Sequence, residues 1–227
     1  TVNAQYTDDQ TTAENVTAEA TDAVTNVNDA GSVAISGTAT QGQTLTATVS
    51  DDDGVTGTIT YQWKRGSTDI GTNSATYVLV QADVGSTITV NAQYTDDQTT
   101  AENVTAEATD AVTNVNDAGS VAISGTATQG QTLEATVSDG DGVPSSITYQ
   151  WKRGSTDIGT NSATYVLVQA DVGSTITVNA QYTDDQTTAE NVTATTATTV
   201  TNVNDVGTVA ISGTATQGQT LEATVSD

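Results

Sequence analysis

The side chains of this chain that could bind a ligand are carboxylates and amides, and they recur in every repeat of the sequence. In one repeat they form three groups: Asn26-Val-Asn28-Asp29, Asp51-Asp52-Asp53-Gly54 and Asp96-Asp97. Because the chain contains no His and no Cys, imidazole and thiolate ligands are excluded. Carboxylate and amide oxygens are the ligands that Ca²⁺ prefers, roughly six to eight of them around one ion. These groups therefore predict a Ca²⁺ site built entirely from oxygen atoms.

The expected fold places the three groups at one end of a domain, beside the incoming linker. The turn around Asp83 is expected at the opposite end, where it faces the next linker, so that Asp83 joins Asn116 and Asp117. About four or five carboxylates that converge in this way would repel one another without a cation. The predicted ligands over all copies are Asn28, Asp29, Asp51, Asp53, Asp83, Asp96, Asp97, Asn116, Asp117, Asp139, Asp141, Asp171, Asp184, Asp185, Asn204, Asp205 and Asp227.

The acidic turn differs between the two complete copies in its middle residue. Asp51-Asp52-Asp53 is replaced by Asp139-Gly140-Asp141 in the second copy. Residues i and i+2 of an extended segment point to the same side. The outer pair is therefore expected to share a metal ion, and Asp52 to point elsewhere.

The positions of these groups follow from a repeat of 88 residues. The segment TVNAQYTDDQ begins at residues 1, 89 and 177, and residues 26–113 differ from 114–201 at only 10 of 88 positions. A fixed period of this length predicts an array of small domains. Because every candidate group recurs in each copy, no unique catalytic constellation exists, and we expect no enzyme. We expect a function that copies in series improve, such as length, stiffness or multivalency.

The charge of the chain excludes several partners. The sequence holds 28 acidic and 4 basic residues, a net charge of −24. Nucleic acid is excluded because phosphate contacts need Lys and Arg, and docking on anionic lipid is disfavoured for the same reason. The sequence contains no run of about 18 apolar residues, so membrane insertion is not expected. Such a chain repels itself unless cations neutralise it.

The hydrophobic pattern predicts an all-β fold of tandem immunoglobulin-like, seven-stranded β-sandwiches. Apolar residues alternate with polar ones in short runs bounded by Gly, Asn, Asp or Ser, for example at Ile88, Val90, Ala92 and Tyr94. Six strands are clear, and a seventh, short strand is expected near 68–70, which gives the immunoglobulin-like order. The expected domains are a partial repeat at 1–25 (the last two strands), complete repeats at 26–113 and 114–201, and a partial repeat at 202–227 (the first two strands).

The segments TNVNDAG, TLTATVSDDDG, ITYQW and ATYVLVQADVGSTITV resemble the immunoglobulin-like or cadherin-like extender repeats of large bacterial (RTX-type) surface adhesins. The resemblance covers the whole chain. It implies an extracellular, Ca²⁺-dependent stalk at the cell surface, whose partners are the neighbouring repeats of the same chain. Asn116-Asp117 with Asp139-x-Asp141 also resembles the cadherin linker. The glutamates of the preceding cadherin domain have no clear match here, so the resemblance does not itself support Asp83 as a ligand.

Other interpretations remain open at this stage. The acidic groups, Asp96-Asp97 above all, could form plain polar turns. Glu107 and Asp110 become Thr in the second copy, so we interpret them as solvated surface charge. Trp63 is expected in the core and Lys64 on the outer face, whereas Arg65 is expected to pair with a carboxylate.

Other functions also remain open. One is a self-assembling extracellular filament, in which other copies of the chain are partners. Another is a sugar- or ice-binding module, suggested by Thr-x-Thr pairs that the wet face of a sandwich also explains. We interpret the partial end repeats as a window on a longer repetitive chain. The alternative is that they pair with strands of another chain.

Overall fold

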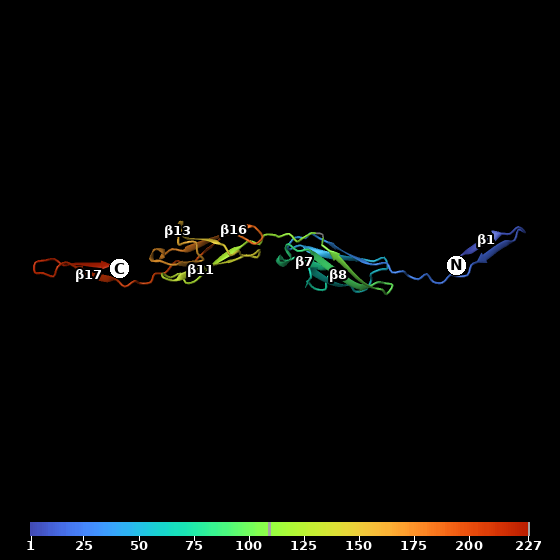
Figure 1. Ribbon diagram of the computed structural model, residues 1–227, viewed down its shortest axis with the longest axis horizontal. Helices are drawn as coiled ribbons and strands as arrows, with labels where there is room; N and C mark the ends of the chain where they lie inside the picture. The colour runs from blue at the N-terminus through green and yellow to red at the C-terminus, as the bar shows by residue number, and fades with distance from the viewer. Residues whose placement is uncertain (109, 227) are drawn as a thin grey trace. The chain divides into compact units, whose positions relative to one another are not determined.

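The computed structural model describes residues 1–108 and 110–226 (Figure 1). Asp227, a predicted ligand, and the side chain of Glu107 lie outside the described residues. The chain divides into two compact units, residues 1–113 and 114–227. Each unit combines one complete sandwich with one isolated β-hairpin.

The first sandwich consists of two antiparallel sheets. One sheet has the order β3-β4-β7 and the other β6-β5-β8-β9. Among the described residues this gives the seven strands that the sequence predicts, in an immunoglobulin-like arrangement. Their bounds are β3 Ser32–Ser36, β4 Thr44–Ser50, β5 Thr60–Arg65, β6 Thr68–Ile70, β7 Thr76–Val78, β8 Ile88–Thr95 and β9 Ala101–Glu107. The 3₁₀ helix η1 spans Gln81–Asp83.

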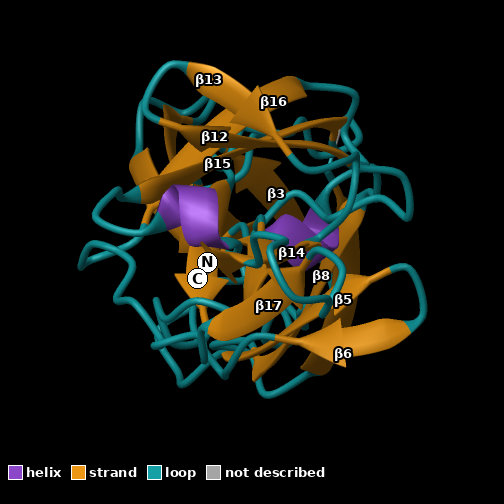
Figure 2. Ribbon diagram, turned by 90° about the vertical axis from the view of Figure 1, so that its left-hand side faces the viewer, coloured by secondary structure: helices purple, strands orange, loops and turns teal. Residues whose placement is uncertain are grey.

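The second sandwich repeats this topology, with sheets β10-β11-β14 and β13-β12-β15-β16. Figure 2 shows the strands in orange and the short 3₁₀ helices in purple. The bounds are β10 Ser120–Ser124, β11 Thr132–Ser138, β12 Thr148–Arg153, β13 Thr156–Ile158, β14 Thr164–Val166, η2 Gln169–Asp171, β15 Ile176–Thr183 and β16 Ala189–Thr195. The predicted fold class, tandem all-β sandwiches, is therefore confirmed.

The core of the first sandwich is filled by the apolar face of each sheet. Leu45 on β4 and Trp63 on β5 are buried, and Ile88 and Val90 on β8 are fully buried. The ring of Trp63 stacks on Tyr77, with centroids 5.9 Å apart, and its indole N–H donates to the carbonyl of Ser74 at 2.9 Å. Burying one such aliphatic side chain stabilises the fold by roughly 1.5–3 kcal/mol. Trp63 is thus a core residue, as predicted.

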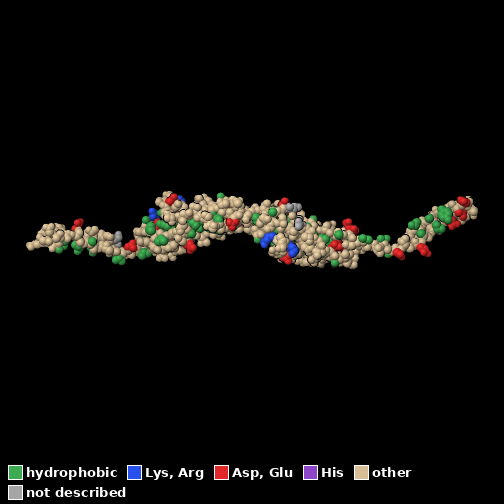
Figure 3. All heavy atoms as spheres, in the orientation of Figure 1, with side chains coloured by type: hydrophobic (Ala, Val, Ile, Leu, Met, Phe, Trp, Pro, Cys, Tyr) green, Lys and Arg blue, Asp and Glu red, His purple; other side chains and the backbone are tan. Residues whose placement is uncertain are grey.

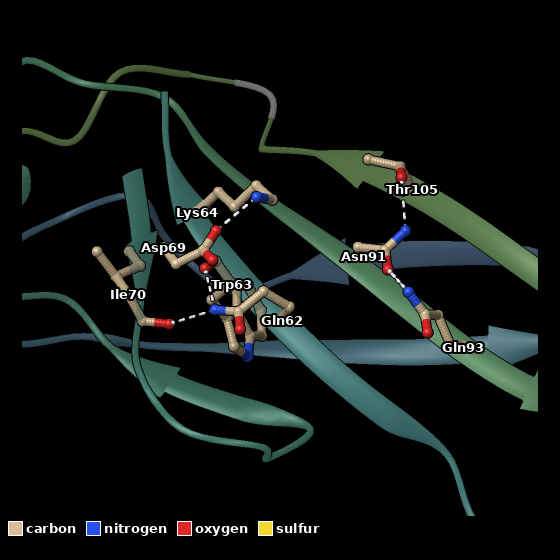
Figure 4. A network of polar contacts seen from close by, with 8 residues as sticks. All are labelled: Gln62, Trp63, Lys64, Asp69, Ile70, Asn91, Gln93 and Thr105. Atoms are coloured by element: carbon tan, nitrogen blue, oxygen red, sulfur yellow. Dashed lines mark hydrogen bonds and ion pairs between the residues drawn. The ribbon is translucent and has the colours of Figure 1, made fainter. Parts of the chain in front are cut away.

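The outer face of the β5–β8–β9 sheet is polar, as the alternation predicts. Figure 4 shows Gln62 donating to the carbonyl of Ile70, and Asn91 linking Gln93 to Thr105. Lys64 lies on this face and pairs with Asp69 across to β6. The side-chain amides form hydrogen bonds to one another and to neighbouring strands, so this outer face can remain polar and exposed to solvent.

The isolated hairpins keep the pairing of the corresponding strands in the sandwiches. In the first, β1 (Asn3–Thr7) pairs with β2 (Ala13–Thr17). The second joins β17 (Thr208–Ser212) to β18 (Glu222–Ser226). Their apolar side chains are exposed; Ile211, for example, is 71% exposed. Among the described residues, no helix has the length and apolarity required to span a bilayer.

Candidate cation site at the entrance of each sandwich

A tight turn positions the first acidic group directly after β4. The Gly54 N–H donates to the carbonyl of Asp51 at 3.1 Å, and the Asp53 N–H donates to Asp51 Oδ1 at 2.9 Å. Gly54 has φ +94°, a conformation that favours glycine. The sequence interpretation of this segment as extended is therefore wrong: the outer aspartates come together through a turn closed by a side chain.

Carboxylates from three parts of each sandwich converge beside this turn. In the first sandwich Asp51, Asp96 and Glu102 each offer an oxygen, and these atoms lie within 4.8 Å of one another. The equivalent group in the second sandwich is Asp139, Asp141 and Asp184, within the same distance. We call these groups, together with Asp53 in the first and Glu190 in the second, the first and second entrance sites.

The linker that enters each sandwich is bonded directly to its entrance site. The Asn28 amide donates to Glu102 Oε1 at 2.9 Å, and the Asp29 N–H donates to Asp53 Oδ2 at 2.7 Å. In the second sandwich Asn116 donates to Glu190 Oε1 at 3.1 Å. The linker residues that the sequence singled out therefore lie at the predicted group of carboxylates.

Tyr94 fixes the position of Asp51 in the first entrance site. Its hydroxyl donates to Asp51 Oδ2 at 2.7 Å, and Tyr182 makes the same bond to Asp139. Burial, then the hydrogen bond to Asp51, raises the pKa of Tyr94 above its ordinary value, so the phenol stays a neutral donor. Gly31 permits this contact, because a Cβ there would lie 1.7 Å from the Tyr94 hydroxyl.

Several carboxylate oxygens in these sites are buried without a donor. Asp96 is 4% exposed, and its Oδ2 has no hydrogen-bond partner among the described residues. The same holds for Asp141 Oδ1 and Asp184 Oδ2, whose residues are 2% and 5% exposed. The other oxygen of Asp96 accepts the Gln98 and Thr100 N–H groups. A buried, unsatisfied carboxylate oxygen costs about 1–3 kcal/mol or more, so this donor set fits a bound cation.

The second aspartate of each Asp-Asp pair lies at the edge of the site. Asp97 is exposed, and its Oδ1 accepts the Thr56 N–H at 3.2 Å and the Thr56 hydroxyl at 2.5 Å. Asp185 is also exposed, and its carboxylate lies against Gly142, where a Cβ would be 2.4 Å from Oδ2. These residues border the buried group without joining its closest set.

Asp83 and Asp171 do not join the entrance sites. Asp83 is fully buried, and its carboxylate accepts from Arg65 at 3.0 Å, the Tyr77 hydroxyl at 2.9 Å and the Val80 N–H at 2.9 Å. Asp171 has the equivalent partners. Arg65 was expected to pair with a carboxylate, and that carboxylate is Asp83. Both oxygens of Asp83 already accept from protein donors, which leaves little basis for its predicted role as a ligand.

The exit linker of the second sandwich holds the last predicted pair. Asp205 Oδ2 accepts from the Gln129 amide at 3.2 Å, and the Asn204 amide donates to the carbonyl of Asp205 at 3.2 Å. Gln129 also accepts the Val203 N–H at 3.2 Å. These contacts orient the linker, and among the described residues no group of carboxylates forms around Asp205.

Glu102 and Glu190 are site residues that the sequence reasoning missed. They lie near the start of β9 and β16, six positions after Asp96 and Asp184, and pair with Tyr94 and Tyr182 across the hairpin. The available signal was their identity across copies: Glu14, Glu102 and Glu190 are retained, whereas Glu107 is replaced.

Basic side chains are few around the acidic ones, as the sparse blue and scattered red atoms of Figure 3 show.

The fold and the entrance sites define the chain as a tandem array of immunoglobulin-like β-sandwich domains with a recurring acidic site. No protein-family model and no curated protein matches it. Among solved structures, it is similar to three N-terminal domains of the Highly Immunogenic Outer Capsid protein (Hoc) of bacteriophage RB49. The two share 18% identity with a TM-score of 0.32, over 87% of this chain and 70% of that one.

A second similar structure is a Ca²⁺-stabilized adhesin that helps an Antarctic bacterium reach out and bind ice. It shares 14% identity with a TM-score of 0.33, over 92% of this chain. The chain spans 58% of the length of that adhesin chain. At these TM-scores neither likeness carries an argument about function, which must come from the site itself.

Proposed function

We propose that the chain is a segment of an extracellular adhesin stalk, in which Ca²⁺ bound at each entrance site stiffens the array. The observation that supports this most is the set of buried carboxylate oxygens without donors, at Asp96, Asp141 and Asp184. A cation would satisfy these oxygens and offset the repulsion among their charges. The proposal includes no catalytic step.

The linker contacts give the proposed ion a mechanical role. Asn28 and Asp29 are bonded to Glu102 and Asp53, so an ion held by those carboxylates would restrain the chain where it enters the sandwich. Without the ion, repulsion among the carboxylates would loosen the same contacts. Ca²⁺ would thereby limit the angles that successive domains adopt.

Small-angle scattering of the full chain tests this role. We expect a larger maximum dimension in about 1 mM Ca²⁺, a level that extracellular modules use, than in excess chelator at matched ionic strength. The variant Asp69→Asn, which removes an exposed acid paired with Lys64 away from the entrance sites, should keep the same Ca²⁺-dependent change in maximum dimension as the unmodified chain. Scattering curves that coincide with and without Ca²⁺ would refute the stiffening role.

A self-assembling filament is the second candidate function. Val209 and Ile211 on β17 are 67% and 71% exposed, whereas Val121 and Ile123, at the equivalent positions of β10, pack against the second core. Exposed apolar strand faces of this kind can pair with another copy. Sedimentation velocity at increasing protein concentration separates the candidates, because a filament grows and a stalk segment stays monomeric.

A further inference from the structure

The two entrance sites differ in how many carboxylate oxygens they leave without a donor. In the first, Asp96 Oδ2 is buried and unpartnered, whereas in the second both Asp141 Oδ1 and Asp184 Oδ2 are. Asp141 is 2% exposed, while its counterpart Asp53 is only half-buried. The second site therefore holds more buried, unsatisfied negative charge.

One cause lies in the middle residue of the acidic turn, Gly140 in place of Asp52. A Cβ at Gly140 would lie 3.0 Å from both Cβ and Oδ2 of Asp117. Glycine thus lets Asp117 of the entering linker pack closely against the turn, where its N–H donates to Asp141 Oδ2 at 2.7 Å. Asp52 carries a Cβ at this place and a side chain that is exposed.

A second difference, at the edge of the site, is Pro144 in place of Thr56. Thr56 donates its N–H and its hydroxyl to Asp97 Oδ1, which occupies that carboxylate. Proline has neither donor, and among the described residues no hydrogen bond reaches the carboxylate of Asp185. The second site consequently keeps a further carboxylate at its edge that is not committed to a protein donor.

We propose that the second entrance site binds Ca²⁺ more tightly than the first, so that the two sandwiches fill in a fixed order as Ca²⁺ rises. This inference rests on the proposed Ca²⁺ binding. The extra charge of Asp52 acts in the opposite direction, but it is exposed and screened by salt. One additional buried oxygen without a donor corresponds to a difference of about tenfold in Kd.

Single-site variants of the full chain measure the two affinities separately. Asp96→Asn disables the first site and Asp184→Asn the second. Asparagine keeps the oxygen that accepts Gln98 and Thr100 in the first turn, so the turns persist, and circular dichroism checks the fold. In Ca²⁺ titrations by calorimetry, D96N should retain a Kd about tenfold lower than D184N.

Exchanging the two residues between the sandwiches tests the cause. In the D184N background, the pair Asp52→Gly and Thr56→Pro should tighten the remaining site about tenfold, and in D96N the pair Gly140→Asp and Pro144→Thr should weaken it. Asp69→Asn, the matched control, should change neither Kd.

The outcomes separate this inference from the function beneath it. Equal Kd values in D96N and D184N, or tighter binding in D184N, overturn the ordered filling and leave the Ca²⁺ sites standing. Exchange variants that leave both Kd values in place overturn the assigned cause. A wild-type chain that binds no Ca²⁺ at millimolar concentration overturns the proposed function as well.

Discussion

The hydroxyl of Tyr94 donates to Asp51 Oδ2 at 2.7 Å across 43 positions of sequence. This bond joins the end of a buried core strand to the first carboxylate of the entrance site. Tyr182 and Asp139 repeat it in the second sandwich. The same side chain therefore belongs to the core through its ring and to the site through its oxygen, so the proposed cation binding would be linked to stability.

Replacing both tyrosines by phenylalanine should destabilise the sandwiches. Tyr94→Phe with Tyr182→Phe removes a hydrogen bond to a charged group, about 1.5–3 kcal/mol per sandwich. In chelator this lowers the melting temperature by roughly 10 °C, and less in Ca²⁺, because the ion can take up the freed oxygen. The matched control is Tyr61→Phe with Tyr149→Phe. An equal fall in melting temperature with and without Ca²⁺ would show that the two tyrosines do not act on the cation site.

Gly31→Ala should disturb the first entrance site through steric contact alone. The new Cβ would lie 1.7 Å from the Tyr94 hydroxyl and 2.8 Å from Asp51 Oδ2, so the tyrosine must move. We expect Ca²⁺ affinity at the first site to fall about tenfold or more, measured by calorimetry in the D184N background. Gly57→Ala is the control, because its Cβ meets only the Thr95 carbonyl at 3.5 Å. Comparable affinities for the two alanine variants would contradict this geometry.

Asp83→Asn should lower stability and leave Ca²⁺ binding unchanged. The substitution breaks a buried pair with Arg65, and removing one partner of such a pair costs about 3–5 kcal/mol. Denaturant unfolding measures the loss, and calorimetry the affinity. Asp69→Asn, which breaks the exposed pair with Lys64, should cost less than about 1 kcal/mol. A higher Kd for Ca²⁺ in D83N would indicate that Asp83 is a ligand after all.

The buried tyrosines should make the protein sensitive to alkaline pH. Burial, then the hydrogen bond to Asp83, raises the pKa of Tyr77 to about 12, and Tyr165 is raised in the same way by Asp171. An unfolded tyrosine ionises near pH ~10. Between these values the unfolded state loses protons that the native state keeps. The contribution of these tyrosines to stability is therefore constant below pH ~10 and is lost as the pH rises above it.

Denaturant unfolding at pH 9 and pH 11 tests this alkaline loss, at about one unit on each side of the ordinary tyrosine pKa. The variant with Tyr77→Phe and Tyr165→Phe should lose less stability between the two values than the wild type. An identical loss in both proteins would assign the alkaline effect to other groups.

The strands could be predicted from sequence because their signal is local. Thr-rich alternation gives β4 and β8, and even the short β6 falls at the expected residues 68–70. The grouping of the acidic turns at one end followed from strand order, since the carboxylates of Asp51 and Asp96 come from chain reversals at the same end of antiparallel strands. Identity between copies identified Asp52 as the dispensable member of its turn.

The structure differs from the sequence expectations where contacts between distant residues decide the geometry. Asp83 was predicted as a ligand because its turn was expected to face the next linker, whereas in the structure Arg65, 18 residues away, pairs with it inside the sandwich. Glu102 was missed because a single acid within a strand resembles solvated charge; only the pairing of β8 with β9 brings it beside Asp96. The extended geometry assumed for Asp51 and Asp53 failed because an aspartate side chain can close a turn on the backbone two residues later.

Thermal unfolding in Ca²⁺ and in chelator tests most directly whether a cation satisfies the buried carboxylates. Binding at 100 times Kd adds about 2.7 kcal/mol to a native state, so Ca²⁺ should raise the wild-type melting temperature by roughly 10 °C or more at matched ionic strength. The double variant with Asp96→Asn and Asp184→Asn should show no such rise. A wild-type melting temperature that ignores Ca²⁺, or an equal rise in the double variant, would contradict the account.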